Sequence, residues 1–330
     1  MNVLVTGGSG FIGSRLVRRL LADGHDVRIL DREVNPEFAQ ITLQGDVADP
    51  DAVSRALGGI ELVYHLAAEY RDDVRPIERY YHTNVEGTRV LCEGLSKFNI
   101  RRLVFTSSVA VYGFNMNDLR EDAPRDPKNH YGLSKSRGED LIGAWRSADP
   151  GRVVAVMRPC VVFGPGNRGN VYTLLRQIMS HRFVMIGNGR NRKSMAYVEN
   201  VVAALVYLSQ LQQSMLVNYA DKPDFSMQEL LAAVRGIAGA SIPRWRLPRW
   251  LGTLGGIAAD SLARMSGRTF QITRERITKF CATSVVNVDR LHQLGFLPSH
   301  TLQEGLETTI RSDFLNNRMG ATDHARQVRP

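Results

Sequence analysis

The 330-residue sequence predicts an α/β protein built on a doubly wound parallel sheet, followed by a smaller, mostly helical C-terminal part. Short apolar runs alternate with helical patterns through the first half of the chain, as expected of strands that are buried on both faces. Helix-length segments between these runs provide the crossovers that parallel strands require. Because such crossovers are right-handed, the strands form a doubly wound sheet.

The expected strands share short length, apolar composition and flanking polar residues. They are residues 2–6, 26–31, 41–47, 61–68, 101–108, 153–159 and, returning to the sheet from later in the chain, 215–220. The expected helices share apolar residues at helical spacing. They are residues 11–24, 50–57, 78–98, 131–147 and 195–211.

The composition limits the classes of partner and site. The 42 Lys and Arg against 33 Asp and Glu give a net charge of +9, which favours anionic partners such as nucleotides, nucleic acid or a membrane surface. Cys92, Cys160 and Cys281 are too far apart for a CxxC pair, and the eight histidines form no HxxxH, so no disulfide framework and no metal site are predicted. No apolar run approaches the roughly 20 residues of a membrane span, and no cleavable leader is recognised. The cytoplasm is therefore the expected location.

A glycine-rich segment, TGGSGFIG at residues 6–13, lies between the first expected strand and the first expected helix. Gly8, Gly10 and Gly13 fit G-x-G-x-x-G, and Gly7, Gly10 and Gly13 fit a variant of it. Glycines let the backbone approach a pyrophosphate closely, and the helix N-terminus offers free N–H groups. A plain strand–helix turn is the alternative, but the flanking strand and helix favour dinucleotide binding, as in a Rossmann fold.

An acidic residue, Asp31, ends the next strand about 20 residues further on, where it would bind the adenosine ribose. Its carboxylate would repel a 2′-phosphate, which favours NAD. Arg32 could pair with that phosphate, so NADP is the alternative. The segments 45–47 and 65–68 end later strands and are expected to line the same crevice.

Three hydroxyl side chains, the last of them Ser108, end the strand expected at residues 101–108. In the next helix, Tyr131 and Lys135 are four positions apart and so share one face. Ordinary surface helices also carry such pairs, but the hydroxyl-bearing strand upstream favours a functional site.

Taken in order, these segments resemble the extended short-chain dehydrogenase/reductase family, in particular its NAD-dependent nucleotide-sugar epimerase/dehydratase branch, which includes UDP-glucose 4-epimerase-like proteins. The matching motifs cover roughly residues 1–205: TGGSGFIG, Asp31, GDV, HLAA, TNVEGT, FTSSVAVYG, YGLSK, RPCVVFGPG and GNGRNRKSMAYVENV. GFLPSHTLQEGL, at residues 295–306, resembles the family's C-terminal ending. The resemblance implies NAD contacts from Gly7, Gly10, Phe11, Ile12, Gly13, Asp31, Arg32, Asp46, Val47, Leu66, Ala67, Ala68, Tyr131 and Lys135.

The same resemblance implies catalytic roles for Ser108, Tyr131 and Lys135. Tyr131 would exchange a proton with a sugar hydroxyl. A phenol is a poor base at neutral pH, and the Lys135 cation would favour the phenolate. Lys135 would also hold the nicotinamide ribose, and Ser108 would donate a hydrogen bond to the substrate oxygen. Substrate contacts are expected from Ser108, Tyr131, Asn170, Val171 and Lys193.

Some positions depart from the family pattern. Val109 and Ala110 stand where 4,6-dehydratases carry an Asp–Glu pair, which argues against dehydration. Val161 stands where an Asn often faces the nucleotide diphosphate. Lys193 replaces a phosphate-binding arginine, and lysine keeps the charge but not the two-pronged hydrogen bonding. The base and the sugar therefore stay open.

The resemblance predicts a Rossmann domain at residues 1–165, with a returning segment at about 195–220, and a substrate-binding domain at residues 166–330. The polar tail, residues 316–330, is expected to be disordered. A homodimer is implied, and no nucleic acid partner is expected.

The predicted function is NAD-dependent epimerisation at C4 of a nucleotide-diphosphate sugar, UDP-linked, by transient oxidation to a 4-keto intermediate. The alternative is an NAD(P)-dependent 4-keto-sugar reductase or dehydrogenase that acts on a nucleotide sugar in polysaccharide biosynthesis and would use the same residues for half of that cycle. The basic loop 187–193 counts against a relative that acts on a hydrophobic alcohol. The intact Ser108, Tyr131 and Lys135 count against a silent NAD-binding sensor or assembly subunit.

A basic, tryptophan-bearing stretch at residues 241–265 allows two interpretations. Trp245, Trp250 and several arginines could rest on an acidic membrane surface, where lipid-linked sugars are assembled. A cap over the substrate pocket is the favoured interpretation, and weak membrane-surface association is the alternative.

Overall fold

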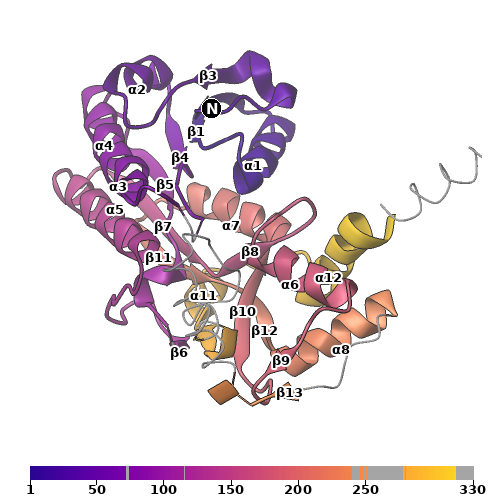
Figure 1. The fold of residues 1–330 in the computed structure, drawn as a ribbon. Helices are drawn as coiled ribbons and strands as arrows, with labels where there is room; N and C mark the ends of the chain where they lie inside the picture. Colours follow the sequence, from indigo (N-terminus) through magenta and orange to yellow (C-terminus); the bar gives the residue numbers. More distant parts are fainter. Residues whose placement is uncertain are drawn as a thin grey trace, which may run out of the picture.

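The computed structural model describes residues 1–71, 74–114, 116–239, 246–248, 250–251, 278 and 280–316. Figure 1 shows a parallel sheet with helices on both faces, and beside it a second group of strands and helices built mainly from later residues. No helix in this described part of the chain is long and apolar enough to cross a membrane.

The main sheet has seven parallel strands in the order β11-β7-β5-β4-β1-β2-β3. Their bounds are β1 Asn2–Thr6, β2 Asp26–Asp31, β3 Thr42–Gln44, β4 Leu62–His65, β5 Arg102–Thr106, β7 Val153–Pro159 and β11 Met215–Tyr219. The predicted return of residues 215–220 to the sheet is confirmed, since Val217 pairs with Met157. The strand order reverses at β1, so the crevice beyond the carboxyl ends of β1 and β4 is the expected ligand site of such a sheet.

The two faces of the sheet are covered by different helices. Helices α1 (Phe11–Ala22) and α7 (Val198–Gln210) cover one face, and α2 (Pro50–Leu57), α4 (Gly87–Lys97) and α5 (His130–Ser147) cover the other. Side chains alternate between the faces along β1: Val3 and Val5 join one core, and Leu4 joins the other. This explains the continuous apolar runs in the sequence.

The helix expected over residues 78–98 is interrupted. It consists of α3 (Glu78–Tyr81), a wider π-type turn over His82–Glu86, and α4. Turns of this kind inside helices are frequent at functional sites. Here the turn carries Asn84, which is buried.

The helix expected over residues 195–211 starts later than predicted, at Val198. Residues Met195–Tyr197 instead complete strand β10 (Arg192–Tyr197), where Ala196 pairs with Val162. Tertiary strand pairing therefore overrides a helical pattern that continues without a break in the sequence.

A second, five-stranded sheet was not expected from the sequence. It has the order β12-β10-β14-β6, with β8 on the other part of β10. The new strands are β6 Met116–Leu119, β8 Val161–Phe163, β12 Asp221–Ser226 and β14 Ser284–Val286. Helices α6 (Asn170–Met179), α8 (Met227–Ala238) and α12 (Leu302–Ile310) share a core beside this second sheet, whereas α11 (Asp289–Gln293) packs against the main sheet through Leu291. The predicted division near residue 165 stays a prediction.

A small two-stranded sheet pairs β9 (Met185–Ile186) with β13 (Arg246–Leu247). It is the only described strand pairing within the stretch 241–265 that the sequence analysis singled out. Trp245 and the tail beyond residue 316 lie outside the described residues.

Candidate active site

The glycine loop lies between β1 and α1 and is shaped by close backbone contacts. Gly7 has a φ of 73°, and a Cβ there would lie 2.6 Å from the backbone nitrogen of Ala67. A Cβ at Gly13 would lie 2.1 Å from the Gly7 carbonyl oxygen. Only glycine fits these positions, so the loop is pressed against the strand end at residues 65–68. The first turn of α1 carries no acidic residue, and its Gly10 N-cap provides no side-chain cap. This free N-terminus fits a pyrophosphate.

Asp31, the last residue of β2, is tied to that loop. One carboxylate oxygen accepts a hydrogen bond from the Ser9 backbone N–H at 3.0 Å, and the other accepts one from Glu33 at 3.1 Å. The carboxylate is therefore held beside the glycines with lone pairs left for ribose hydroxyls. The guanidinium of the neighbouring Arg32 lies 3.9 Å from the buried Glu69 carboxylate.

The other predicted cofactor contacts follow later strands at the same edge of the sheet. Asp46 accepts a hydrogen bond from Ala48 and lies 3.2 Å from His82, while Val47 packs against Gly87 at the start of α4. The structure thus brings the predicted residues to the carboxyl-end edge of the main sheet. Their contacts with NAD stay a prediction.

Ser108 and Tyr131 lie on segments in direct contact. Ser108 follows β5 and opens a short turn, in which its Oγ accepts a hydrogen bond from the Ala110 N–H at 3.2 Å. The Ser108 hydroxyl hydrogen can therefore point to a substrate oxygen. Helix α5 starts one residue before the half-buried Tyr131, and a Cβ at Gly132 would lie 2.4 Å from the Ala110 carbonyl oxygen. The helix start is therefore fixed directly on the Ser108 turn.

Lys135 lies one helical turn after Tyr131 and is completely buried, with 1% exposure. Its ammonium lies 4.3 Å from the centre of the Phe105 ring. Burial lowers the pKa of Lys135 to about 7, and the negative charge of Glu139 opposes that shift. The ammonium is thus poised to exchange its proton near neutral pH.

A neutral histidine lies beside this lysine. Burial, followed by the charge of Lys135, lowers the pKa of His65 to about 3. Its two ring nitrogens contact the hydroxyls of Thr6 at 2.7 Å and Thr88 at 3.0 Å. His65 is therefore a satisfied core residue that joins β1, β4 and α4, and it adds no second cation beside Lys135.

Asn84, in the π-type turn, connects the crevice to α5. Its side-chain oxygen accepts from the Glu69 N–H at 2.8 Å, and its amide donates to the Glu69 carbonyl and to Ser134 Oγ. Ser134 is the residue before Lys135. The turn thus fixes the backbone after β4 against α5, the helix that carries Tyr131 and Lys135.

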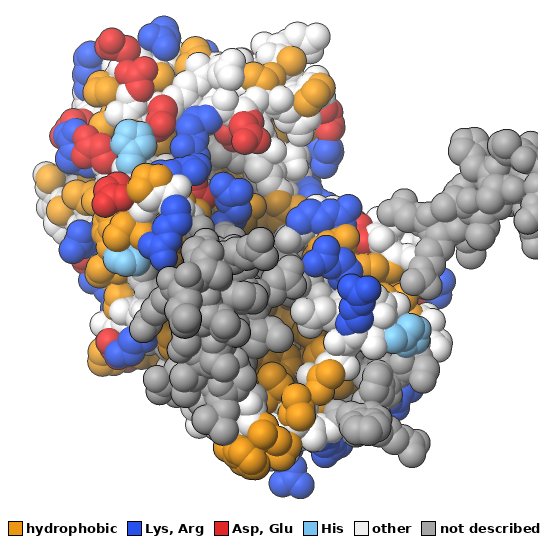
Figure 2. All heavy atoms as spheres, in the orientation of Figure 1, with side chains coloured by type: hydrophobic (Ala, Val, Ile, Leu, Met, Phe, Trp, Pro, Cys, Tyr) orange, Lys and Arg blue, Asp and Glu red, His pale blue; other side chains and the backbone are white. Residues whose placement is uncertain are grey.

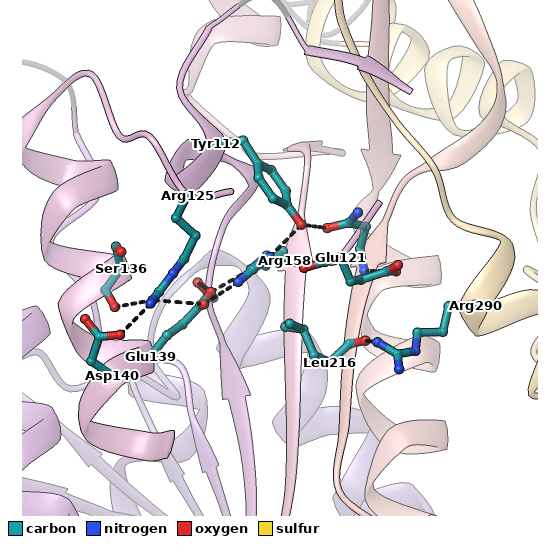
Figure 3. A network of polar contacts seen from close by, with 11 residues as sticks. Tyr112, Glu121, Arg125, Ser136, Glu139, Asp140, Arg158, Leu216 and Arg290 are labelled. Atoms are coloured by element: carbon teal, nitrogen blue, oxygen red, sulfur yellow. Dashed lines mark hydrogen bonds and ion pairs between the residues drawn. The ribbon is translucent and has the colours of Figure 1, made fainter. Parts of the chain in front are cut away.

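Sequence reasoning missed a buried ion pair beside the turn that Ser108 opens (Figure 3). Glu139 accepts from Ser107 Oγ at 2.5 Å and from the Arg158 guanidinium at 2.8 and 2.5 Å. Arg158 also donates to Tyr112, on the turn that Ser108 opens. The Glu139 carboxylate thus fixes the side chain of Ser107, the residue before Ser108, and its negative charge favours the protonated form of Lys135. The available signals were an acid four residues after Lys135 and an arginine in an apolar strand.

The predicted substrate residues lie in the second part of the fold. Asn170 and Val171 open α6, the first exposed and the second buried. The loop before them returns to the cofactor cradle, because a Cβ at Gly164 would lie 3.3 Å from the Phe11 ring. Lys193 on β10 donates to the Ala282 carbonyl at 2.6 Å, and burial lowers its pKa to about 8. Substrate contacts of these residues stay predictions.

Comparison with known proteins gives consistent results. The model of the NAD dependent epimerase/dehydratase family matches residues 3–218. The N-acetyl-alpha-D-glucosaminyl-diphospho-ditrans,octacis-undecaprenol 4-epimerase of Escherichia coli O157:H7 is 42% identical over 318 residues, 96% of each chain. The UDP-glucose 4-epimerase of Lactobacillus helveticus is 28% identical, over 86% of this chain and 96% of the relative. The structure of MoeE5 in complex with UDP-glucose and NAD superposes with a TM-score of 0.75 at 26% identity, covering 97% of this chain and 100% of MoeE5.

Proposed function

Because the chain belongs to the NAD-dependent epimerase/dehydratase family, we propose that it inverts C4 of a hexose whose anomeric oxygen carries a diphosphate. The single observation that carries this proposal is the contact between the Ser108 turn and the start of α5, with Lys135 buried one turn later. The family model and the two 4-epimerase relatives confirm the sequence-based prediction of an NAD-dependent sugar 4-epimerase.

NAD is the cofactor, and the crevice fits it. Gly7 and Gly13 leave no room for a Cβ, the α1 N-terminus is free of a side-chain cap, and Asp31 lies beside the glycines. When bound, NAD supplies the group that accepts the C4 hydride and returns it. Asp31 and the engagement of Arg32 with Glu69 favour NAD over NADP.

The residues of the chain would handle the proton and the geometry. The Lys135 ammonium would keep Tyr131 as a phenolate, and this phenolate would accept the proton of the C4 hydroxyl as the sugar is oxidised, becoming a neutral phenol. Ser108 donates a hydrogen bond to the same oxygen and fixes its distance from Tyr131. The 4-keto sugar then turns over in the pocket, and Tyr131 returns the proton to O4 after C4 has been reduced on its other face.

Two carriers are compatible with a sugar diphosphate. The sequence analysis predicted UDP, the MoeE5 structure is a complex with UDP-glucose and NAD, and the Lactobacillus helveticus relative is named a UDP-glucose 4-epimerase. The Escherichia coli relative, whose name gives an undecaprenol carrier, is more similar to this chain and matches almost all of it. The protein-bound ammonium of Lys193 and the presence of Val161 in place of Asn also weaken nucleotide recognition. We therefore keep a polyprenyl diphosphate as the second candidate.

Proton NMR of the anomeric and H4 signals tests the function. Purified protein with NAD is mixed separately with UDP-N-acetylglucosamine and with polyprenyl-diphospho-N-acetylglucosamine. A C4 epimer formed without net loss of NAD is the expected product of either carrier. A 4-keto product formed in step with NAD loss would show that the protein is a dehydrogenase and would contradict the proposed epimerase activity.

A matched pair of variants tests the assignment of the proton shuttle. Tyr131→Phe should lower turnover at least about a hundredfold and keep the bound NAD. Tyr207→Phe, which removes a hydroxyl on α7 that donates to Leu294, is the control and should keep near wild-type turnover. Wild-type turnover in Tyr131→Phe would remove Tyr131 from the mechanism.

The homodimer implied by the sequence resemblance stays a proposal. The resemblance places the contact on two helices per subunit, one of them α5, which carries Tyr131. Arg137 and Asp140 are exposed on that helix. The cytoplasmic location is likewise a proposal.

A further inference from the structure

The small sheet formed by β9 and β13 is joined to the loop that the sequence analysis assigns to the substrate diphosphate. Arg246 pairs with Met185 and Leu247 pairs with Ile186. The Gly187 N–H, at the start of the loop 187–193, donates to the Leu247 carbonyl oxygen at 2.9 Å. A carrier that leaves the diphosphate at this loop would therefore meet β13 next.

The side chains beside this pairing are apolar and exposed. Val184 is 43% exposed, Leu247 42%, Trp250 63% and Leu251 40%. These four are among the eleven large hydrophobic side chains that are exposed in the described part of the chain, and they come from two neighbouring segments. We call them the β9–β13 surface. Figure 2 shows hydrophobic side chains gathered at this end of the molecule, with basic side chains nearby.

The two sequence segments that contribute these side chains carry only basic charges. No Asp or Glu occurs between Asp149 and Glu199, a stretch with seven arginines and one lysine. None occurs between Glu229 and Asp260 either, where four arginines lie. Arg182 and Arg246 are exposed next to the apolar side chains. Tryptophan and leucine beside arginine, without acidic neighbours, match the interface of an anionic bilayer, where rings and chains enter the headgroup region and cations meet phosphates.

We propose that the β9–β13 surface rests on an anionic lipid bilayer and brings the diphosphate loop to a membrane-borne carrier. The inference deepens the second candidate of the proposed function and rests on it. It also accounts for a tryptophan that is mostly exposed to water.

Co-sedimentation with vesicles tests the proposal with the full chain. The vesicles contain phosphatidylcholine alone, or phosphatidylcholine with phosphatidylglycerol. Wild-type protein should bind only the anionic vesicles, and binding should weaken as salt rises. Trp250→Ser with Leu251→Ser should lower the partition constant more than about tenfold. Arg246→Gln should lower it about fivefold.

Leu297→Ser is the matched control, because Leu297 is 77% exposed and lies between α11 and α12, away from this surface. It should partition like the wild type, and circular dichroism should show that every variant is folded. Wild-type protein that ignores anionic vesicles, or a Trp250/Leu251 variant that binds them equally well, would overturn the proposal.

Turnover separates this proposal from the proposed function. The Trp250/Leu251 variant should lose more turnover on vesicle-borne polyprenyl-diphospho-N-acetylglucosamine than on UDP-N-acetylglucosamine in solution. Equal losses on both would overturn the membrane role. Absence of epimerisation by wild-type protein on both sugars would overturn the proposed function, whatever the vesicles show.

Discussion

At the scale of single residues, the site depends on a lysine that is completely buried. Moving an ammonium out of water is costly, and the chain offsets only part of this cost. The Phe105 ring faces the cation at 4.3 Å, and the charge of Glu139 favours its protonated form. The neighbouring His65 stays neutral and therefore adds no repulsion. The protein thus retains a costly charge at the position from which, in the proposed mechanism, Lys135 stabilises the Tyr131 phenolate.

The lowered pKa of Lys135 predicts a pH-dependent stability. The unfolded chain keeps this proton up to the ordinary pKa of 10.5, whereas the folded chain releases it near pH 7. Between these two pH values the unfolded state binds more protons than the folded state, so the free energy of unfolding rises with pH. Below about pH 7 both states carry the proton, and the folded protein bears the full cost of burying the charged ammonium. In protein freed of NAD, Lys135→Met should therefore raise the free energy of unfolding more at about pH 6 than at about pH 9, and the two increases should differ by about 2 to 3 kcal/mol.

Urea unfolding of the wild type and of Lys135→Met at both pH values measures how the effect of the substitution on the free energy of unfolding changes with pH. Groups that titrate equally in both proteins cancel in this comparison. Equal effects of the substitution at both pH values would mean that Lys135 keeps an ordinary pKa in the folded protein. The variant should also lose turnover, because no cation then favours the phenolate.

Some residues of the site could be predicted from the sequence and others could not. Ser108, Tyr131 and Lys135 were predicted because their spacing and order recur as a motif. Glu139 and Arg158 were missed because an acid on a helix and an arginine in a strand are compatible with solvent exposure. Only the fold shows that they meet in a place that excludes water.

At the scale of elements, the proposed catalytic residues Ser108 and Tyr131 are aligned by a contact between a turn and a helix. Gly132 lets the start of α5 touch the Ala110 carbonyl, and a Cβ there would lie 2.4 Å from that oxygen. The neighbouring atom is backbone, so the added methyl group must push the helix away from the Ser108 turn. The distance between Ser108 and Tyr131 would then increase.

Gly132→Ala should therefore lower kcat about a hundredfold, since displacements below about 1 Å can cost this much when two groups act on one atom. Gly143→Ala is the control on the same helix, because a Cβ there meets nothing within 4 Å. It should keep kcat and raise helix stability by up to about 1 kcal/mol. Steady-state kinetics and thermal unfolding of both variants check this, and a Gly132→Ala enzyme with wild-type kcat would contradict the alignment.

The elements of the main sheet could be predicted because each strand is a continuous apolar run buried on both faces. Their ends were less predictable. Residues 45–47, 66–68 and 107–108 continue the strand pattern in sequence but leave the sheet to line the crevice. The second sheet was missed because β6, β8 and β14 span only three or four residues, too few to show a period of two.

At the scale of the whole molecule, one buried carboxylate joins the two sheets. Asp221 opens β12 two residues after β11 ends, and it is 1% exposed. It accepts hydrogen bonds from the Tyr197 N–H at 2.6 Å, from Asn200 at 2.9 Å and from the Tyr219 hydroxyl at 2.8 Å. Asn200 in turn donates to the carbonyl of His300, near the C-terminal helix α12. The main sheet, the second sheet, α7 and the C-terminal segment thus meet at this residue.

Asp221→Asn should destabilise the whole protein although it preserves size. The carboxylate accepts hydrogen bonds on both of its oxygens, whereas an amide accepts on one oxygen only. Its NH₂ group would therefore face one of the present donors, which would lose its acceptor. A buried donor without an acceptor costs about 1 to 3 kcal/mol of stability. Asp140→Asn is the control, since Asp140 pairs with Arg125 at the surface and such pairs contribute about 1 kcal/mol or less. Urea unfolding should show a loss of about 2 kcal/mol or more for Asp221→Asn in a single transition, because both sheets lose the same anchor. A loss no larger than that of Asp140→Asn would mean that the sheets are held together elsewhere.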